Sequence, residues 1–421
     1  MRAKSPWGIL VISLAFFFGA GIVTEGQRPA QQQAPPPDYG AALANLPFRE
    51  IGPAIMGGRI DEFAVVESDP KIIYVGVAVG GVWKTTNSGT TWEPVFDSQN
   101  ISSIGAVAIA PSDPSIVWVG SGEANNRQSS SWGNGIYKST DAGRTWKNMG
   151  LADSHHIGRI AIHPTNPNIV YAAALGHLWG PNKERGVYKT TDGGRTWQNV
   201  LYINEDTGVQ DIAIDRRSPD TLYAGAYQHR RSPYGYNGGG PASAIYKTTD
   251  GGATWKKLTR GLPYENPKDG DTGRIGLNIY RRNSNIVYAI VEHKNGGVFR
   301  SEDAGETWTR MSDVNPRPVY YSQVCVDPNN DLRVWVLGSP LYYSEDGGKT
   351  FIRRDTKIHV DFHALWINPR DSAHMLLGSD GGITMSWDYG KTWDFMNTFP
   401  IGEFYEVSYD FSKPYRVAGG L

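Results

Sequence analysis

The chain of 421 residues contains 50 glycines, 26 prolines, 14 tryptophans and 22 tyrosines, a composition typical of short β-strands joined by tight turns. Its 41 basic and 42 acidic residues give a formal net charge of -1, which argues against a nucleic-acid partner because no excess of basic charge is present. Cys325 is the single cysteine, which excludes a disulfide within the chain and gives little support to a zinc–thiolate site or a cysteine nucleophile.

The first 26 residues have the pattern of a targeting segment. Arg2 and Lys4 precede an uncharged apolar run over residues 7–23, which is short for a membrane-spanning helix. We expect a signal peptide over residues 1–26 that is cleaved on export, with a retained anchor as the alternative. The proline- and glutamine-rich residues 27–45 predict a linker. The mature protein is then expected in the periplasm or outside the cell, without a membrane span.

A short motif of the form Ser/Thr-x-Asp-x-Gly-x-Thr-Trp recurs seven times after residue 46. In one-letter code the copies read KTTNSGTTW at 84–92, KSTDAGRTW at 138–146, KTTDGGRTW at 189–197, KTTDGGATW at 247–255, RSEDAGETW at 300–308, YSEDGGKTF at 343–351 and MSWDYGKTW at 385–393. They lie about 42 to 58 residues apart, which is the length of a four-stranded propeller blade. The repeat predicts an all-β fold, a β-propeller of seven four-stranded blades within residues 46–421.

Each copy of the motif places one acidic or amide side chain in a tight turn. These residues are Asn87, Asp141, Asp192, Asp250, Asp303, Asp346 and Asp388. An Asp or Asn side chain in such a turn accepts hydrogen bonds from the backbone N–H groups that follow it, so we expect a structural role. A metal-binding or catalytic role is the alternative, but one residue per blade spreads the set around the rim.

The last residues predict the start of a further blade. FYEVSYD at 404–410 reads as an inner strand and YRVAGGL at 415–421 as the strand after it. A blade that stops at its second strand leaves an unpaired edge, so we expect the chain to be the front portion of a longer protein. Closure of the ring by these two strands is the alternative.

The repeated hairpin resembles the Asp-box, also called the BNR repeat. This motif occurs in sialidases, xyloglucan-cleaving glycoside hydrolases, photosystem II assembly factors and the sortilin/Vps10 propeller. The segments IGPAIMGGRI at 51–60, GGVWKTTNSGTTWEPVFD at 80–97 and HVDFHALWINP at 359–369 resemble an exported bacterial family described as sortilin N-terminal-domain-like or glycosyl hydrolase BNR-repeat proteins. The resemblance implies the propeller fold and leaves the activity open, because the motif decorates unrelated functions.

Two departures weaken a direct transfer of enzymatic activity from these relatives. No arginine triad of the sialidase type can be assigned. Xyloglucan-cleaving enzymes carry an Asp just before the Gly-Gly that opens the first hairpin, whereas this chain has Val79 before Gly80 and Gly81. Glycosidases usually need two carboxylates, for which Glu123 and Asp361 are the candidates.

A candidate metal site precedes the inner strand of the seventh blade. His359, Asp361 and His363 alternate, so their side chains point to one face of a strand. Histidine and carboxylate ligands suit zinc or another divalent metal, which is the candidate cofactor. The alternative is a polar network that fills the mouth of the channel. By blade alignment, His155 and His156 occupy the corresponding place in the third blade.

Longer insertions between the repeated elements are the candidate ligand-binding loops. They span residues 123–135, 177–186 and 228–241 and mix arginine with tryptophan or tyrosine. Such side chains stack on apolar faces and bind hydroxyls or carbonyls, although the same loops could be plain surface. The candidate ligand-binding residues are Arg127, Trp132, His155, His156, Arg159, Trp179, Arg230, Tyr321 and Asp380.

These observations favour an exported binding module that recognises a peptide, protein or glycan at the channel mouth. The alternative is a glycoside hydrolase of the sialidase-like or xyloglucanase-like superfamily that uses Glu123 or Asp361 as acid or base. A third reading is a structural or assembly factor without a convergent pocket. Convergence of the His/Asp cluster with Glu123 or Asp380 on one open pocket would favour catalysis or metal binding.

Overall fold

The computed structural model describes residues 57–125, 130–355 and 357–420. The chain divides into two units, Met1–Glu50 and Ile51–Leu421, and the second is described below. The expected signal peptide and linker, and the candidate residue Arg127, lie outside the described residues. Within the described ranges, no helix is long and apolar enough to cross a membrane.

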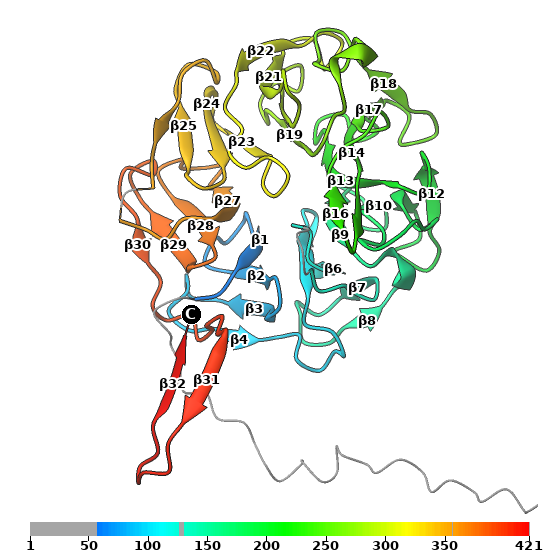
Figure 1. The fold of residues 1–421 in the computed structure, drawn as a ribbon. Helices are drawn as coiled ribbons and strands as arrows, with labels where there is room; N and C mark the ends of the chain where they lie inside the picture. Colours follow the sequence, from blue (N-terminus) through cyan, green and yellow to red (C-terminus); the bar gives the residue numbers. More distant parts are fainter. Residues whose placement is uncertain (1–56, 126–129, 356, 421) are drawn as a thin grey trace, which may run out of the picture. The chain divides into compact units, whose positions relative to one another are not determined.

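Seven antiparallel sheets of four strands each form a ring, which confirms the predicted all-β propeller (Figure 1). Each blade runs from an inner to an outer strand. Blade 1 has β1 (Ile60–Val65), β2 (Ile73–Val77), β3 (Gly81–Thr85) and β4 (Glu93–Pro94); blade 2 has β5 (Ile104–Ala110), β6 (Asp113–Ser121), β7 (Ile136–Ser139) and β8 (Lys147–Asn148). Blade 3 has β9 (Ile157–Ile162), β10 (Val170–Ala174), β11 (Gly186–Thr190) and β12 (Gln198–Leu201); blade 4 has β13 (Thr207–Ile214), β14 (Leu222–Gln228), β17 (Ala244–Thr248) and β18 (Lys256–Leu258).

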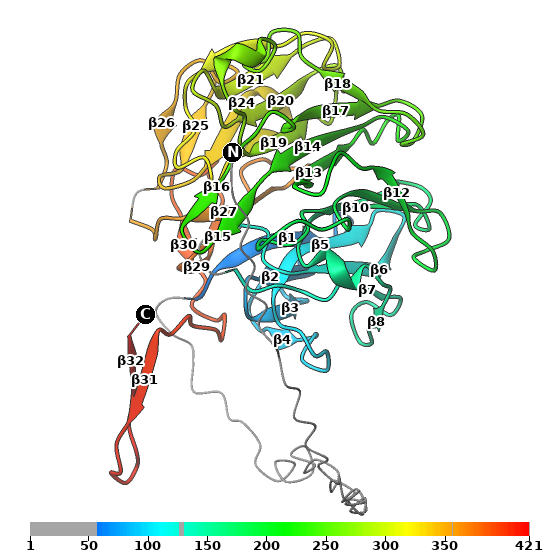
Figure 2. The same cartoon turned by 45° about the vertical axis from the view of Figure 1, so that its right-hand side comes forward.

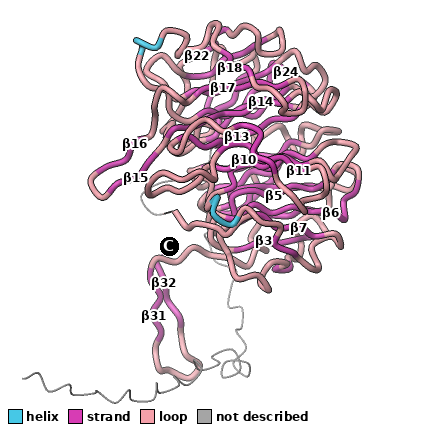
Figure 3. The backbone as a smooth tube through the Cα atoms, turned by 90° about the vertical axis from the view of Figure 1, so that its right-hand side faces the viewer, coloured by secondary structure: helices cyan, strands magenta, loops and turns pink. Residues whose placement is uncertain are grey.

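The remaining blades repeat this order. Blade 5 has β19 (Ile275–Ile279), β20 (Val287–Val291), β21 (Gly297–Ser301) and β22 (Thr309–Ser312); blade 6 has β23 (Gln323–Asp327), β24 (Asn330–Leu337), β25 (Tyr342–Ser344) and β26 (Ile352–Arg353). Blade 7 has β27 (Phe362–Ile367), β28 (Met375–Ser379), β29 (Gly382–Ser386) and β30 (Asp394–Phe395). The short helices are η1 (Ala152–Ser154) and η2 (Pro267–Asp269), and Figure 3 shows strands and loops elsewhere.

Two further hairpins stand outside the blade sheets. β15 (Arg230–Ser232) pairs with β16 (Gly235–Asn237) in the insertion of blade 4, and β31 (Glu406–Tyr409) pairs with β32 (Val417–Gly420). The second hairpin corresponds to the two strands expected after the seventh motif. It forms a sheet of its own, and its side chains are exposed. The ring closes without it, because Gly57 N–H donates to the carbonyl of Gly381 at 2.8 Å and joins blade 1 to blade 7.

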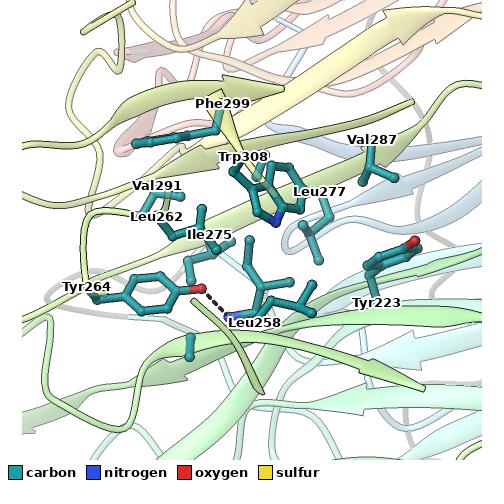
Figure 4. Close-up of a cluster of buried hydrophobic side chains, with 13 residues drawn as sticks. Tyr223, Leu258, Leu262, Tyr264, Ile275, Leu277, Val287, Val291, Phe299 and Trp308 are labelled. Carbon is teal, nitrogen blue, oxygen red and sulfur yellow. Dashed lines mark hydrogen bonds between the residues drawn. The ribbon is translucent and has the colours of Figure 1, made fainter. Parts of the chain in front are cut away.

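The hydrophobic core is divided among the interfaces between blades. Seven buried clusters each combine side chains of two neighbouring blades, including one that joins blade 7 to blade 1. Figure 4 shows the cluster between blades 4 and 5, in which the hydroxyl of Tyr264 accepts a hydrogen bond from Ile245 N–H at 2.8 Å. Neighbouring sheets, such as those of β13 and β19, therefore pack face to face (Figure 2).

Small residues in the second strands let the blades approach closely. A Cβ added to Gly120 would lie 2.4 Å from the Ile157 side chain, and one added to Gly378 would lie 2.7 Å from Ile60. In both cases the isoleucine is the first residue of the inner strand of the next blade. Because glycine has no side chain, it permits this close contact between blades. This explains why the second strands of blades 2 and 7 contain Val-Gly and Leu-Gly.

The Asp-box turns make the hydrogen bonds that the motif predicts. In blade 6, Asp346 accepts from the Ser344 hydroxyl at 2.7 Å and from the backbone N–H and hydroxyl of Thr350 at 2.9 and 2.7 Å. In blade 4, the corresponding bonds from Thr254 lower the pKa of Asp250 to about 2. The Asp-box side chains, six carboxylates and the amide of Asn87 in blade 1, bond within their own turns and do not converge on a common site.

Candidate functional site

The inner strands begin at one end of the channel, which we call the first mouth, and end at the second mouth. A buried ion pair lies at the first mouth between blades 1 and 2. The guanidinium of Arg59 lies 3.2 Å from the carboxylate of Glu123, and their side chains are 3% and 1% exposed. Arg59 also donates to the hydroxyl of Tyr320 at 3.0 Å, and His156 contacts the carbonyl of Glu123 at 2.9 Å. Glu123 thus ties together three blades and the loop before blade 6.

Asn125 is the centre of a second set of buried contacts. Its side-chain nitrogen lies 3.3 Å from Asp61 and 3.1 Å from His363 Nδ1, and its oxygen accepts from Arg274 at 2.6 Å. Arg274 in turn donates to the carbonyl of Tyr320 at 2.5 Å. Side chains of blades 1, 2, 5 and 7 are therefore joined through one amide.

Asp61 is the strongly perturbed carboxyl of this network. Its pKa is raised to about 7, because burial and the negative charge of Glu123 outweigh the opposite effects of His363, Arg59 and Asn125. Its Oδ2 atom has no hydrogen-bond partner among the described residues. A carboxyl with such a pKa changes its charge near neutral pH.

Two carboxylates of blade 7 lie at the more open side of the network. Asp361 accepts from the hydroxyl of Tyr321 at 2.6 Å, and Asp380 lies 2.8 Å from Nε2 of His363. The backbone N–H of Asp380 donates to the carbonyl of Asp361 at 3.1 Å, and the rings of Tyr321 and His363 are 5.1 Å apart. Asp380 is 28% exposed while His363 is fully buried. The structure thus brings four of the sequence candidates together.

The hydrogen bonds of His363 indicate its tautomer. Nε2 faces a carboxylate, which only accepts, and Nδ1 faces the amide nitrogen of Asn125, which only donates. Both contacts are satisfied when the proton is on Nε2 and Nδ1 accepts. The ring then directs an N–H group at Asp380.

The structure does not assemble the trio of His359, Asp361 and His363 as metal ligands. His359 is exposed and its Nδ1 contacts the neighbouring carbonyl of Val360 at 2.7 Å. His363 has both ring nitrogens occupied, as described above. Strand alternation placed the three on one face, but the positive φ of 68° at Asp361 turns the backbone before β27 begins.

The structure distributes the remaining sequence candidates over different environments. Trp132 and Trp179 are 62% and 51% exposed. Trp132 stacks on His155, with ring centroids 5.9 Å apart. His156 is buried, which lowers its pKa to about 3. Arg230 pairs with Asp206 at the base of the β15–β16 hairpin.

Arg159 lies deeper in the channel than the first mouth. Its guanidinium bridges Glu62 and Asp211, the latter at 3.1 Å. These three residues line a cavity of about 350 Å³ that also contacts Cys325, whose pKa is raised to about 12 by burial. A thiol with this pKa stays protonated, so it is no nucleophile. At the second mouth Glu67 pairs with Arg216 and Arg281.

Five members of the network are not among the residues expected from sequence: Arg59, Asp61, Asn125, Arg274 and Tyr320. A usable signal was the tripeptide Gly-Arg-Ile, which occurs at 58–60, 158–160 and 273–275. It opens or enters the inner strand in blades 1, 3 and 5. Three arginines at the starts of inner strands indicate charges directed into the channel.

Comparison with known proteins supports both the fold and its repeat. Residues 134–285 match the Sortilin-Vps10 family, described as sortilin, neurotensin receptor 3. The chain is 25% identical over 371 residues to a xyloglucanase of Paenibacillus sp, covering 75% of this chain and 33% of that protein. It is 25% identical over 278 residues to the photosystem II assembly lipoprotein Ycf48 of Picosynechococcus sp., covering 54% and 74%. The chain is a BNR-type β-propeller.

Solved structures agree with this assignment of the propeller. The GH74 xyloglucanase from Xanthomonas campestris matches with a TM-score of 0.61 and 17% identity, over 86% of this chain and 57% of that one. The GH74 enzyme of Niastella koreensis matches with a TM-score of 0.58 and 19% identity, over 85% and 56%. The chain spans about a third of the length of the Paenibacillus xyloglucanase. The solved structures support the fold. The xyloglucanases matched by sequence favour the glycoside hydrolase alternative over the binding-module interpretation.

Proposed function

We propose that this BNR-type propeller is a glycoside hydrolase that binds a polysaccharide chain across the first mouth, with Asp361 and Asp380 as its two carboxylates. The observation that carries the proposal is the junction of these residues, each held by a ring that contacts the other ring. Glycoside hydrolysis commonly uses one carboxylic acid to protonate the leaving oxygen and a second carboxylate as base or nucleophile.

Both carboxylates accept a hydrogen bond from a ring, Asp380 from the imidazole of His363 and Asp361 from the hydroxyl of Tyr321. One of them serves as the acid that protonates the leaving oxygen and the other as base or nucleophile. Burial raises the pKa of Tyr321, and the hydroxyl remains a donor at neutral pH.

Glu123 has a different part in this proposal from the one that the sequence suggested. Its side chain is 1% exposed and faces Arg59, so a substrate cannot reach it without opening a buried ion pair. We therefore assign it to positioning, through Arg59 and Tyr320, of the residues that do face the mouth.

Exposed aromatic side chains provide the surface that a sugar chain needs. Trp132 and Trp179 belong to two insertions beside the first mouth, and Tyr234 at the tip of the β15–β16 hairpin is 95% exposed. Aromatic rings stack against the apolar faces of sugars, while nearby polar groups bind the hydroxyls. Large exposed aromatics of this kind are what a polysaccharide-binding surface requires.

The position that carries an Asp in xyloglucan-cleaving enzymes is Val79 here, and its side chain is 51% exposed. An apolar group there cannot transfer a proton. The chemistry is therefore assigned to the two carboxylates of blade 7.

The test is the release of reducing ends from a panel of polysaccharides that includes xyloglucan, measured with the full chain. We expect Asp361→Asn and Asp380→Asn each to lower the rate by at least about 100-fold, because each removes an acid or base of the reaction. The matched control is Asp394→Asn, an exposed Asp of the outer strand β30, for which we expect an unchanged rate.

Binding measurements on the same panel separate the alternatives. Retained binding by the two slow variants supports the assignment of chemistry to Asp361 and Asp380. Binding without hydrolysis by the unaltered chain would instead establish a binding module. Neither binding nor hydrolysis of any glycan would overturn the proposal.

A further inference from the structure

Three metal-ligating side chains lie together in the loops of blade 3. Asp153 belongs to η1, His155 follows it, and His177 lies in the insertion after β10. Their ligand atoms all lie within 4.8 Å of one another, and no other group of three or more His, Cys, Asp or Glu residues meets this condition in the described part of the chain. The blade 7 carboxylates and His363 are not members of this group.

The separations fit one ion. Nε2 of His177 lies 3.1 Å from Oδ1 of Asp153, and Nε2 of His155 lies 3.7 Å from the same oxygen. Two ligand atoms of a tetrahedral zinc ion, each about 2.0 to 2.1 Å from the metal, are roughly 3.3 Å apart. The two distances lie on either side of this value. Because the rings of His155 and His177 are stacked, they must rotate apart to direct both Nε2 atoms at one ion.

The backbone around the three ligands is fixed by its own hydrogen bonds. The buried side chain of Asn182 donates to the carbonyl of Asp153 at 3.2 Å and accepts from His177 N–H at 2.9 Å, which joins the two loops. The carbonyl of His155 accepts from Gly133 N–H at 2.6 Å. Outer contacts of this kind hold ligands in place before a metal arrives.

The two imidazole rings belong to one aromatic stack. The ring centroids of His155 and His177 lie 3.6 Å apart with an interplanar angle of 21°, and Trp132 stacks on the ring of His155. The stack holds the two histidines side by side.

We propose that Asp153, His155 and His177 form a divalent transition-metal site of the zinc type beside the first mouth. Two nitrogens and one oxygen are a donor set that zinc accepts, and three protein ligands leave a fourth position open for water or for a group of a bound molecule. The site is distinct from the blade 7 carboxylates, and the proposal does not depend on hydrolysis.

Calorimetric titration of zinc chloride into the full chain, freed of any histidine tag, tests the site directly. We expect one saturable zinc per chain. His155→Ala and His177→Ala should each weaken zinc binding by at least about 10-fold. Loss of a residue that only orients a metal ligand already lowers the affinity by about this factor, and loss of the ligand itself should lower it at least as much. The matched control is His359→Ala, which removes the exposed histidine of the trio expected from sequence and should leave binding unchanged.

Asp153→Asn provides a variant that tests the same site with little risk to folding, because the Asp153 side chain is 61% exposed. We expect weaker zinc binding and a smaller zinc-induced rise in melting temperature than in the unaltered chain, since a ligand that binds only the folded state stabilises it. Absence of saturable zinc binding in the unaltered chain, or unchanged binding in His155→Ala and His177→Ala, would falsify the proposal. Loss of binding in His359→Ala would move the site to blade 7.

Discussion

The rim of the propeller and its first mouth are built from the same repeat but have opposite characters. At the rim, each blade presents the same Asp-box turn, as in Ser139, Asp141 and Thr145 of blade 2 and Ser386, Asp388 and Thr392 of blade 7. At the mouth, the blades contribute side chains of different types, for example Arg274 of blade 5, Asn125 of blade 2 and His363 of blade 7.

This difference shows where the fold is maintained and where it can be specialised. An Asp-box side chain bonds within its own turn, so each turn is stable in isolation from the others. A mouth residue bonds to other blades and depends on the closed ring, as the contact between Asn125 and His363 shows. Substitutions at the mouth should therefore have larger and more specific effects than substitutions at the rim.

The largest effect is expected from Arg59→Met, which leaves Glu123 buried without its guanidinium. Breaking a buried ion pair by removing one partner costs about 3 to 5 kcal/mol, so the urea midpoint of unfolding should fall strongly. Arg195→Met is the rim control, because Arg195 is exposed and donates to the carbonyl of Asp192. The double variant Arg59→Met/Glu123→Leu should recover much of the loss.

The next effect concerns Asp61 and pH. Its pKa in the folded chain is about 7 against an ordinary value of 3.8, so between these values the folded state holds a proton that the unfolded chain has released. The stability contributed by this proton is complete below pH 3.8 and is lost as the pH rises through 7. A shift of the pKa from 3.8 to about 7 corresponds to a loss of about 4 kcal/mol of unfolding free energy.

Asp61→Asn removes this titration. We expect the variant to gain stability relative to the unaltered chain as the pH is raised from 4 to 8, measured by urea unfolding at each pH. Asp394→Asn, on the exposed strand β30, should run parallel to the unaltered chain. A constant difference between Asp61→Asn and the unaltered chain across this range would show that His363, Arg59 and Asn125 keep the carboxyl ionised throughout.

A smaller loss of stability is expected at the apolar contact between the second strand of blade 2 and the inner strand of blade 3. Gly120→Ala places a Cβ 2.4 Å from the Ile157 side chain, and such overpacking costs about 1 to 3 kcal/mol. Gly235→Ala is the matched control, because a Cβ there has nothing within 4 Å. Thermal melts should give a lower melting temperature for Gly120→Ala than for Gly235→Ala.

The smallest effect is expected at the rim itself. Asp346→Ala removes one turn's bonds to Ser344 and Thr350. Loss of a comparable capping side chain costs about 1 kcal/mol, and neither zinc binding nor hydrolysis should change. A rim substitution that abolished either property would contradict the separation between rim and mouth.

The sequence by itself determined the seven blades, the order of their strands and the role of the Asp-box residues. These features are local, since the turn bonds of Asp346 span no more than four residues and the strands alternate with turns at a regular interval. The sequence also placed Asp361, Asp380, Tyr321 and His363 among the candidates, and these do meet. It grouped His359 with them, because strand alternation says nothing of the turned backbone at Asp361.

Only the tertiary structure decided which side chains meet across blades. Arg59 and Glu123 come from blades 1 and 2, and Asn125 and His363 are 238 residues apart in the chain. His177 joins Asp153 and His155 because Asn182 links the two loops. Such contacts follow from closure of the ring, which brings all inner strands to one channel, and no local pattern of residues carries that information.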